Sequence, residues 1–321
     1  MRHALQALTD ELRRLKQAGV KTVAVSEDAV AALRRSVTAR ASRAAAAPVT
    51  VSEAPAPAAA APARPAPAPQ SAPAAPRTAR TTPVASKSAL PAGLAPIPGT
   101  PPVVSLPAGD KAARWAALHE IVLNDPTCRA HVRPGKKVVL GVGALDARIM
   151  FVGEAPGAEE EIQGEPFVGP AGQLLTKMII GMGLKREDVY IGNIMNWRPE
   201  MPVSGGGEQV GNRAPVEEEM RYCLPYLRAQ IEVVNPELLV ALGATATQGL
   251  LGFGSFKALG DVRGKWHEFS GKPLMVTYHP SYILRNQSNR SKRMIWEDLL
   301  KVMEKAALPI SDRQRNYFLD K

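Results

Sequence analysis

The C-terminal two thirds of the chain carry two repeating patterns of apolar residues. Four continuous apolar runs have the length of a buried strand, and between them apolar residues recur every three to four positions, as on one face of a helix. Continuous apolar strands separated by helices are typical of a parallel sheet that is covered on both faces. The pattern therefore predicts an α/β fold, a three-layer αβα sandwich with a central four-stranded parallel sheet.

Each apolar block gives one expected element. The expected strands are RIMFVG (148–153), VYIGNIM (189–195), ELLVALG (237–243) and PLMVTYH (273–279). The expected helices cover residues 111–124, 172–183, 215–234, 244–252 and 291–306. Pro225 lies inside the third of these helices and should bend or split it, because proline has no amide hydrogen to donate.

The N-terminal third has a different composition. Residues 1–40 are predicted to form a small helical segment, with a leucine stripe over residues 3–17 and a short strand, KTVAVS. Residues 41–108 are more than half alanine and proline, too poor in large apolar side chains to offset chain entropy, so we expect a disordered linker. The globular domain is then expected over residues 109–307, followed by a C-terminal tail, 308–321.

Charge and cysteine content limit the partners. The chain carries a formal net charge of +10, which favours a polyanionic partner, but residues 109–321 hold 27 basic and 25 acidic side chains. A polyanion would therefore meet the globular domain at a local patch. No apolar run reaches the ~18 residues of a membrane helix, no secretory signal is visible, and two cysteines suit a reducing compartment. We expect a cytoplasmic, nucleoid-associated monomer without a membrane partner.

Polar side chains gather where the predicted strands end. The motif GEAPG, from Gly153 to Gly157, follows the first strand, Asn193 ends the second, and HPSYILR, beginning at His279, follows the fourth. The carboxyl ends of parallel strands meet at one edge of the sheet, where such folds bind ligands. The sequence thus predicts that a carboxylate, an amide and an imidazole converge there. Neither a metal-binding spacing, a GxSxG elbow nor a phosphate-binding loop occurs among these residues.

Five ordered motifs resemble the type-4 family of the uracil-DNA glycosylase superfamily: GEAPG, GEPFVGPAG, VYIGNIMNWRP, NRAPVEEE and TYHPSYILR, within roughly residues 115–307. The resemblance implies the same four-stranded sandwich, hydrolysis of the N-glycosidic bond of uracil in DNA, and a role in base-excision repair. Removing a base requires flipping it out of the helix into a pocket. The expected partner is accordingly uracil-containing DNA.

The resemblance also implies a role for each matching residue. The backbone around Gly153, Glu154 and Ala155 would line the uracil pocket, with Phe167 stacked on the base and Asn193 reading its Watson–Crick edge. His279 would donate to uracil O2, and Glu160 would lie near the sugar and the attacking water. The catalytic set is then Glu154, Glu160 and His279. A carboxylate near a cation-like sugar and a donor at the leaving oxyanion are what this bond cleavage needs.

A second group of residues is expected to touch DNA. Leu284 stands where the superfamily places an apolar wedge that fills the gap left by the flipped base. The stretch RNQSNRSKR, 285–293, holds four cations and no acid, which suits binding to phosphates. The expected DNA-binding residues are Ser281, Leu284, Arg285, Arg290, Lys292 and Arg293.

The resemblance further implies a [4Fe–4S] cluster held by four cysteines, and here the sequence departs from the family. Cys128 and Cys223 occupy two of the four positions, while His131 and Trp197 stand at the other two. A cluster needs about four good ligands, and tryptophan offers none. We therefore expect a degenerate iron–sulfur site, no cluster required for catalysis, and two plain buried thiols.

Two alternatives to the active enzyme remain at this stage. One is a protein that binds uracil or other DNA damage without turnover, or that traps it covalently. The other is a degenerate paralogue whose N-terminal segments bind other proteins. The presence together of Glu154, Phe167, Asn193 and His279 argues against the degenerate paralogue, and the absence of a basic insert with a histidine near VGNRAP argues against trapping.

Overall fold

The computed structural model describes residues 90–91, 93–201 and 208–319. The predicted N-terminal helices, the strand KTVAVS and most of the alanine- and proline-rich segment lie outside the described residues. The fold below belongs to the C-terminal compact unit.

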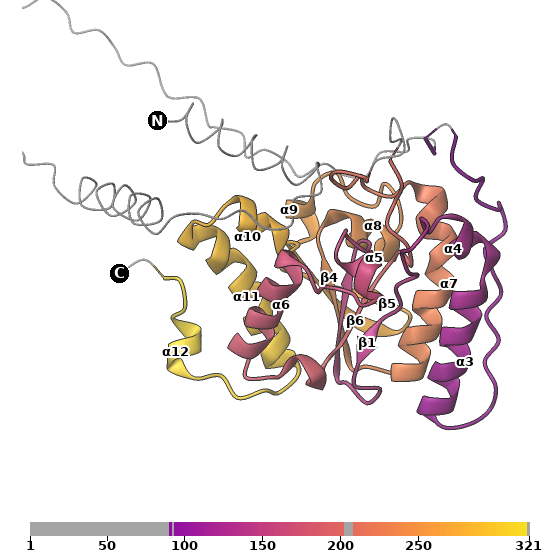
Figure 1. Ribbon diagram of the computed structural model, residues 1–321. Helices are drawn as coiled ribbons and strands as arrows, with labels where there is room; N and C mark the ends of the chain where they lie inside the picture. Colours follow the sequence, from indigo (N-terminus) through magenta and orange to yellow (C-terminus); the bar gives the residue numbers. More distant parts are fainter. Residues whose placement is uncertain (1–89, 92, 202–207, 320–321) are drawn as a thin grey trace, which may run out of the picture. The chain divides into compact units, whose positions relative to one another are not determined.

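A six-stranded sheet in the order β1-β3-β2-β4-β6-β5 forms the centre of this unit (Figure 1). Its four inner strands are parallel, which confirms the predicted four-stranded parallel sheet. They are β3 (Tyr190–Asn193), β2 (Ile149–Gly153), β4 (Leu238–Leu242) and β6 (Lys272–Thr277).

Two short antiparallel strands, which the sequence did not predict, add one strand to each edge. They are β1 (Val142–Gly143), beside β3, and β5 (Trp266–Phe269), beside β6. The first has only two residues, and the second is largely half-exposed and carries a histidine and a glutamate. Neither therefore shows the continuous apolar run that reveals an inner strand.

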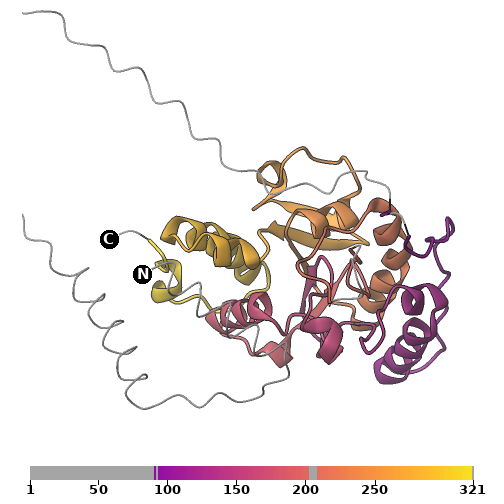
Figure 2. The same ribbon diagram turned by 45° about the horizontal axis from the view of Figure 1, so that its top comes forward.

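Side chains alternate across the sheet and build one core on each face. Helices lie on both faces of the sheet (Figure 2), which gives the three-layer sandwich that the sequence predicted. In β2, Met150 and Val152 join the core beneath α3, α7 and α8, whereas Ile149 and Phe151 join the core beneath α6 and α11. All five residues of β2 are buried, as expected for a strand covered on both faces.

The long helices match the predicted blocks. The helices are α3 (Lys111–Asn124), α4 (Pro126–Ala130), α5 (Glu160–Gln163), α6 (Pro170–Gly181), η1 (Arg186–Asp188), α7 (Glu217–Val234), α8 (Ala244–Leu251), α9 (Leu259–Val262), α10 (Ser281–Arg285), α11 (Asn289–Lys305) and α12 (Asp312–Arg315). The helix α7 runs through Pro225 as one element, so the predicted split does not occur. The carbonyl that proline cannot bond belongs to Arg221, which is an exposed residue. No helix among the described residues has the length and apolar character needed to span a membrane.

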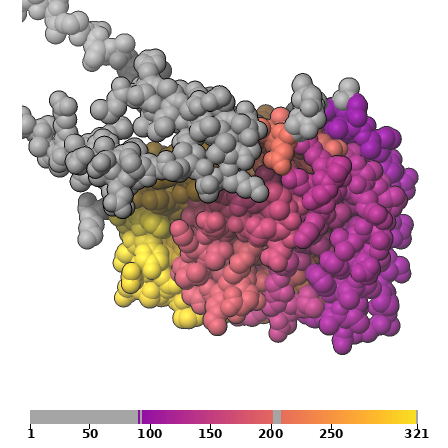
Figure 3. All heavy atoms as spheres, in the orientation of Figure 1, coloured from indigo at the N-terminus to yellow at the C-terminus, as the bar shows by residue number. Residues whose placement is uncertain are grey.

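Segments on both sides of the predicted domain pack on its cores. Ile97, Val104 and Leu106 are partly buried against the α3/α7 core, and Leu308 and Tyr317 against the α6/α11 core. The indole Nε1 of Trp296 also donates to the Gln314 carbonyl at 2.6 Å. Figure 3 shows both segments on the surface, purple at one end and yellow at the other. The domain limits at 109 and 307 stay predictions, but the packed cores include residues beyond them.

These contacts predict how the unit responds to truncation. A chain that begins at residue 93 should be more stable than one that begins at residue 109, because the shorter chain exposes the apolar surface under three partly buried side chains. We expect a difference of about 2–4 kcal/mol in the free energy of unfolding, measured by urea denaturation. Equal free energies of unfolding for the two chains would show that residues 93–108 contact the core without stabilising it.

Candidate active site

Four loops meet at the carboxyl edge of the sheet, and the strand register places two of them side by side. Gly153 at the end of β2 pairs with Asn193 at the end of β3. Beyond these residues, the amide of Ile194 donates to the Gly153 carbonyl at 2.9 Å, and the amide of Met195 donates to the Glu154 carbonyl at 3.1 Å. The two strand ends thus continue together into the site.

Close packing around Gly153 brings an aromatic ring and an amide together. A Cβ at this position would lie 2.4 Å from the Asn193 Oδ1 and 2.4 Å from the Phe167 Cζ. Such distances are far inside van der Waals contact, so any larger residue would push the two side chains away. Both Phe167 and Asn193 are 6% exposed.

The loop that carries Phe167 is held in an unusual conformation. Phe167 has φ of 56°, in the left-handed region that non-glycine residues rarely adopt. The Glu160 carboxylate accepts from the amides of Val168 (3.1 Å) and Gly169 (3.0 Å) on one oxygen and of Gly157 (3.1 Å) on the other. Three charge-assisted bonds to backbone therefore fasten this loop. The predicted place of Glu160 beside the water stays a prediction, and its observed contacts are with the loop.

His279 faces the same space, with its ring centroid 5.6 Å from that of Phe167. Its Nδ1 accepts from the Ser281 amide at 3.2 Å and lies 2.9 Å from the Ser281 Oγ. An Nδ1 that accepts carries no proton, so the neutral ring holds its hydrogen on Nε2. Burial, aided by the positive charge of Arg285, lowers the pKa of His279 from 6.5 to about 4. At neutral pH the residue is thus an uncharged Nε2–H donor.

Glu154 supplies a carboxylate at the same edge. Burial raises the pKa of its carboxyl group, while a hydrogen bond with Thr245 and the charge of Arg285 oppose that rise. The Thr245 side chain comes from the first turn of α8, directly after Gly243. Both His279 and Glu154 therefore have shifted pKa values and share Arg285 as a neighbour, a combination that is common at catalytic sites.

The residues predicted to touch DNA fall into two groups. Leu284 is 41% exposed on α10, and Arg290 is exposed at the start of α11. By contrast, the Ser281 hydroxyl lies against His279 and accepts from Arg285 at 3.2 Å. Arg293 is bonded to Glu297 and to the carbonyls of Arg315 and Tyr317, which hold the C-terminal segment. Lys292 lies over the Phe318 ring.

The positions that correspond to the family's cluster ligands form a packed corner. Cys128, Cys223 and Trp197 are fully buried, and the His131 and Trp197 rings stack with centroids 5.1 Å apart. Burial raises the pKa of both thiols, which disfavours the thiolate form that iron needs. Among the described residues, no group of three or more histidine, cysteine or acidic side chains could hold a metal. The residues present do not fit a four-iron cluster.

Sequence reasoning missed two side chains that shape the site. Thr245, the partner of Glu154, lies in an apolar helix with no motif to mark it. Arg186 donates to the Pro166 carbonyl at 2.7 Å, directly before Phe167, and to Thr176 at 3.2 Å. A lone arginine after a helix carries no signal of this role in the sequence.

Comparison with known proteins agrees with the geometry. Residues 140–300 match the model of the uracil DNA glycosylase superfamily, to which the chain therefore belongs. The chain is 46% identical over 185 residues to the type-4 uracil-DNA glycosylase of Thermotoga maritima, covering 57% of this chain and 90% of that protein. It is 39% identical to the type-4 uracil-DNA glycosylase of Pyrobaculum aerophilum, covering 54% of this chain and 87% of that protein. It is 31% identical to the type-5 uracil-DNA glycosylase of the same organism, covering 51% of this chain and 73% of that protein. Within the superfamily it is a member of the type-4 family.

The state of His279 gives one testable prediction. Long-range ¹⁵N–¹H NMR should show the neutral Nε2–H tautomer from pH 8 down to about pH 5, because burial holds the pKa near 4. The unfolded chain titrates near 6.5, so it binds more protons between the two values. The stabilising contribution of neutral His279 is therefore complete above pH ~6.5 and is lost as the pH falls to about 4. Titration of His279 near 6.5 would refute this description.

The packed corner gives another prediction. Trp197→Ala should lower the free energy of unfolding by about 3–5 kcal/mol, as for other buried tryptophans, without changing the iron content of the purified protein. The half-buried Trp266 in β5 offers a matched control, and Trp266→Ala should cost clearly less. Urea denaturation and metal analysis measure both quantities. Stoichiometric iron that disappears in Trp197→Ala would overturn the assignment of this corner to packing.

Proposed function

We propose that this protein is a uracil-DNA glycosylase, which flips uracil out of DNA and hydrolyses its N-glycosidic bond to start base-excision repair. The observation that carries the proposal is the Asn193 Oδ1, a buried acceptor without a hydrogen-bond partner among the described residues. Unsatisfied buried polar atoms are costly and call for an explanation. The N3–H of uracil is the donor such an acceptor needs, whereas cytosine carries a lone pair at N3.

The neighbours of Asn193 support the same base. The Phe167 ring offers a face for stacking, which is worth about 1–3 kcal/mol per base. The amide Nδ2 of Asn193 can donate to O4 of uracil, and cytosine has a donor at that position instead. The two hydrogen bonds and the stack together select an uncharged pyrimidine with a carbonyl at each side of N3–H.

The reaction needs two further groups, which the same edge supplies. When the bond between C1′ and N1 breaks, its electron pair goes to uracil N1 and O2, and the sugar becomes cation-like. The Nε2–H of neutral His279 donates to O2. This preorganised hydrogen bond stabilises the uracil anion although the imidazole itself carries no charge. The Glu154 carboxylate stabilises the sugar and accepts the proton of the water that attacks C1′.

The other predicted residues support this chemistry, and the place of Glu160 near the attacking water remains part of the predicted site. Glu160 fixes the Phe167 loop through backbone amides, and Ala155 and Gly153 leave room for the base. Leu284, Arg285, Arg290 and Lys292 serve DNA binding from α10 and α11. The three relatives compared above carry glycosylase names, which supports turnover over binding alone.

Asn193→Asp tests the reading of the base. The variant keeps an acceptor for N3–H but places a second acceptor against O4, a mismatch worth about 1–3 kcal/mol. The kcat/KM for uracil excision should then fall by roughly 5- to 150-fold. Asn316→Asp, an equal change on the C-terminal segment, should leave the rate unchanged. Full activity of Asn193→Asp on a uracil oligonucleotide would show that another residue reads the base.

A further inference from the structure

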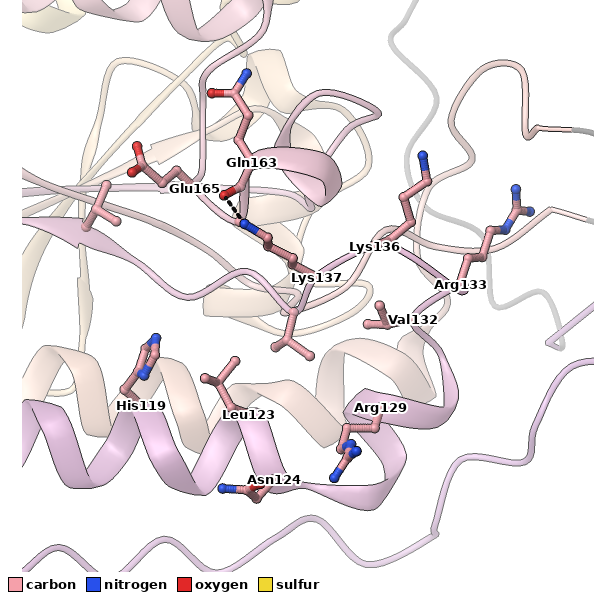
Figure 4. A pocket seen from close by; sticks show the side chains of 13 residues that line it. His119, Leu123, Asn124, Arg129, Val132, Arg133, Lys136, Lys137, Gln163 and Glu165 are labelled. Carbon is pink, nitrogen blue, oxygen red and sulfur yellow. Dashed lines mark hydrogen bonds between the residues drawn. The ribbon is translucent and has the colours of Figure 1, made fainter.

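A groove that is lined by none of the residues of the candidate active site is shown in Figure 4. It has a volume of about 790 Å³ and lies between α3, α4, the segment before β1 and the end of α5. Its walls include the apolar side chains of Leu123, Val132, Val138 and Val142. Neither the motifs nor the proposed chemistry accounts for this groove.

The groove is strongly basic. Arg129, Arg133, Lys136 and Lys137 line it, against a single carboxylate, Glu165. Figure 4 shows Arg133 and Lys136 extending in the same direction from the segment after α4, while Lys137 reaches toward Gln163.

Most of this charge remains available to a ligand. Lys136 is 3.7 Å from Glu208, whose side chain is 91% exposed, so water screens this ion pair. Lys137 donates to the Gln163 carbonyl, which carries no charge. Only Arg133 is held by a partly buried carboxylate, that of Glu200 at 4.0 Å. Within residues 93–201 and 208–319, no carboxylate pairs with Arg129. A hollow with four cations on apolar walls suits a polyanion.

The groove lies on the ligand-binding edge of the sheet. The Lys137 amide donates to the Glu161 carbonyl at 2.7 Å, and the Val139 amide donates to the Asn196 carbonyl at 2.8 Å, three residues beyond the end of β3. Glu165 on its rim precedes Phe167 by two residues, which is at most about 7 Å of chain. A strand of DNA with its uracil under Phe167 would therefore reach the groove directly.

The sheet order places the two cationic surfaces on opposite sides of the pocket. The cations of α10 and α11 follow β6, whereas the groove lies beside β3 and β1. The strands β3 and β6 are three spacings apart, about 14 Å. The two surfaces lie outside these strands, so a DNA strand that reaches both would place several phosphates between them, at about 3.4 Å per phosphate.

We propose that this groove binds the sugar–phosphate backbone on one flank of the flipped nucleotide, while α10 and α11 bind the other flank. The inference rests on the proposed function and adds a second, separate contact with the same DNA strand. It assigns to Arg129, Arg133, Lys136 and Lys137 a role in substrate binding and none in bond cleavage.

The test compares Lys136→Gln/Lys137→Gln with Arg290→Gln/Lys292→Gln. The control is Lys177→Gln/Lys185→Gln, which removes the same charge from exposed positions in α6 and the loop that follows it. Each protein is assayed on two single-stranded oligonucleotides, one with uracil next to the 5′ end and one with uracil next to the 3′ end. We expect Lys136→Gln/Lys137→Gln to raise KM about tenfold for one substrate only, and Arg290→Gln/Lys292→Gln, both in α11, to raise it for the other only.

Salt dependence gives a second readout. Loss of two phosphate contacts should reduce the slope of log affinity against log salt by about 1.4 on single-stranded DNA, with kcat changed less than twofold. A groove variant with the KM and salt slope of the control, or with equal effects on both substrates, would refute the groove. If the unmodified protein releases no uracil from either oligonucleotide, the proposed function itself fails, which separates the two conclusions.

Discussion

The close approach of the Phe167 and Asn193 side chains to the backbone of Gly153 is the contact on which the site depends. A single hydrogen at this position lets Phe167 and Asn193 occupy space that a Cβ would fill, with 2.4 Å to each. The strand register brings Asn193 to this point, and the Glu160 carboxylate brings the Phe167 loop to it. A larger residue here would force the ring and the amide to move from the positions that the register and the loop give them.

Burial at the carboxyl edge of the sheet controls the charge of His279 and Glu154. Burial keeps His279 uncharged and raises the pKa of Glu154, and Arg285 acts on both in the direction of an uncharged imidazole and an ionised carboxylate. A neutral donor and a negative carboxylate suit a leaving group that becomes negative and a sugar that becomes positive. Ser281, two residues after His279, completes this state, because its amide donates to Nδ1 and leaves Nε2 as the donor.

The sequence predicted the inner sheet and the main helices because their apolar periods are long and uninterrupted, as in β2 and α3. It could not predict β5, because a half-exposed edge strand lacks a continuous apolar run. It also could not predict that α7 continues through Pro225, where the carbonyl left without a donor belongs to an exposed residue, Arg221. The residues at the candidate site were found through motifs at strand ends. Their partners were not, because the amides that bind Glu160 and the threonine that binds Glu154 are defined only by the folded chain.

The contacts of Glu160 and Glu161 also change the electrostatic repulsion between this loop and DNA phosphates. Counted along the chain, Glu160 and Glu161 are two negative charges beside a proposed DNA site. In the fold, three backbone amides surround the first, and the buried guanidinium of Arg198 binds the second at 2.7 Å. Their fields are largely cancelled within a few ångströms, so an approaching phosphate meets a weaker repulsion than the formal charges suggest. The repulsion that a phosphate meets at this loop thus comes mainly from the exposed Glu159 and Glu165 and less from Glu160 and Glu161.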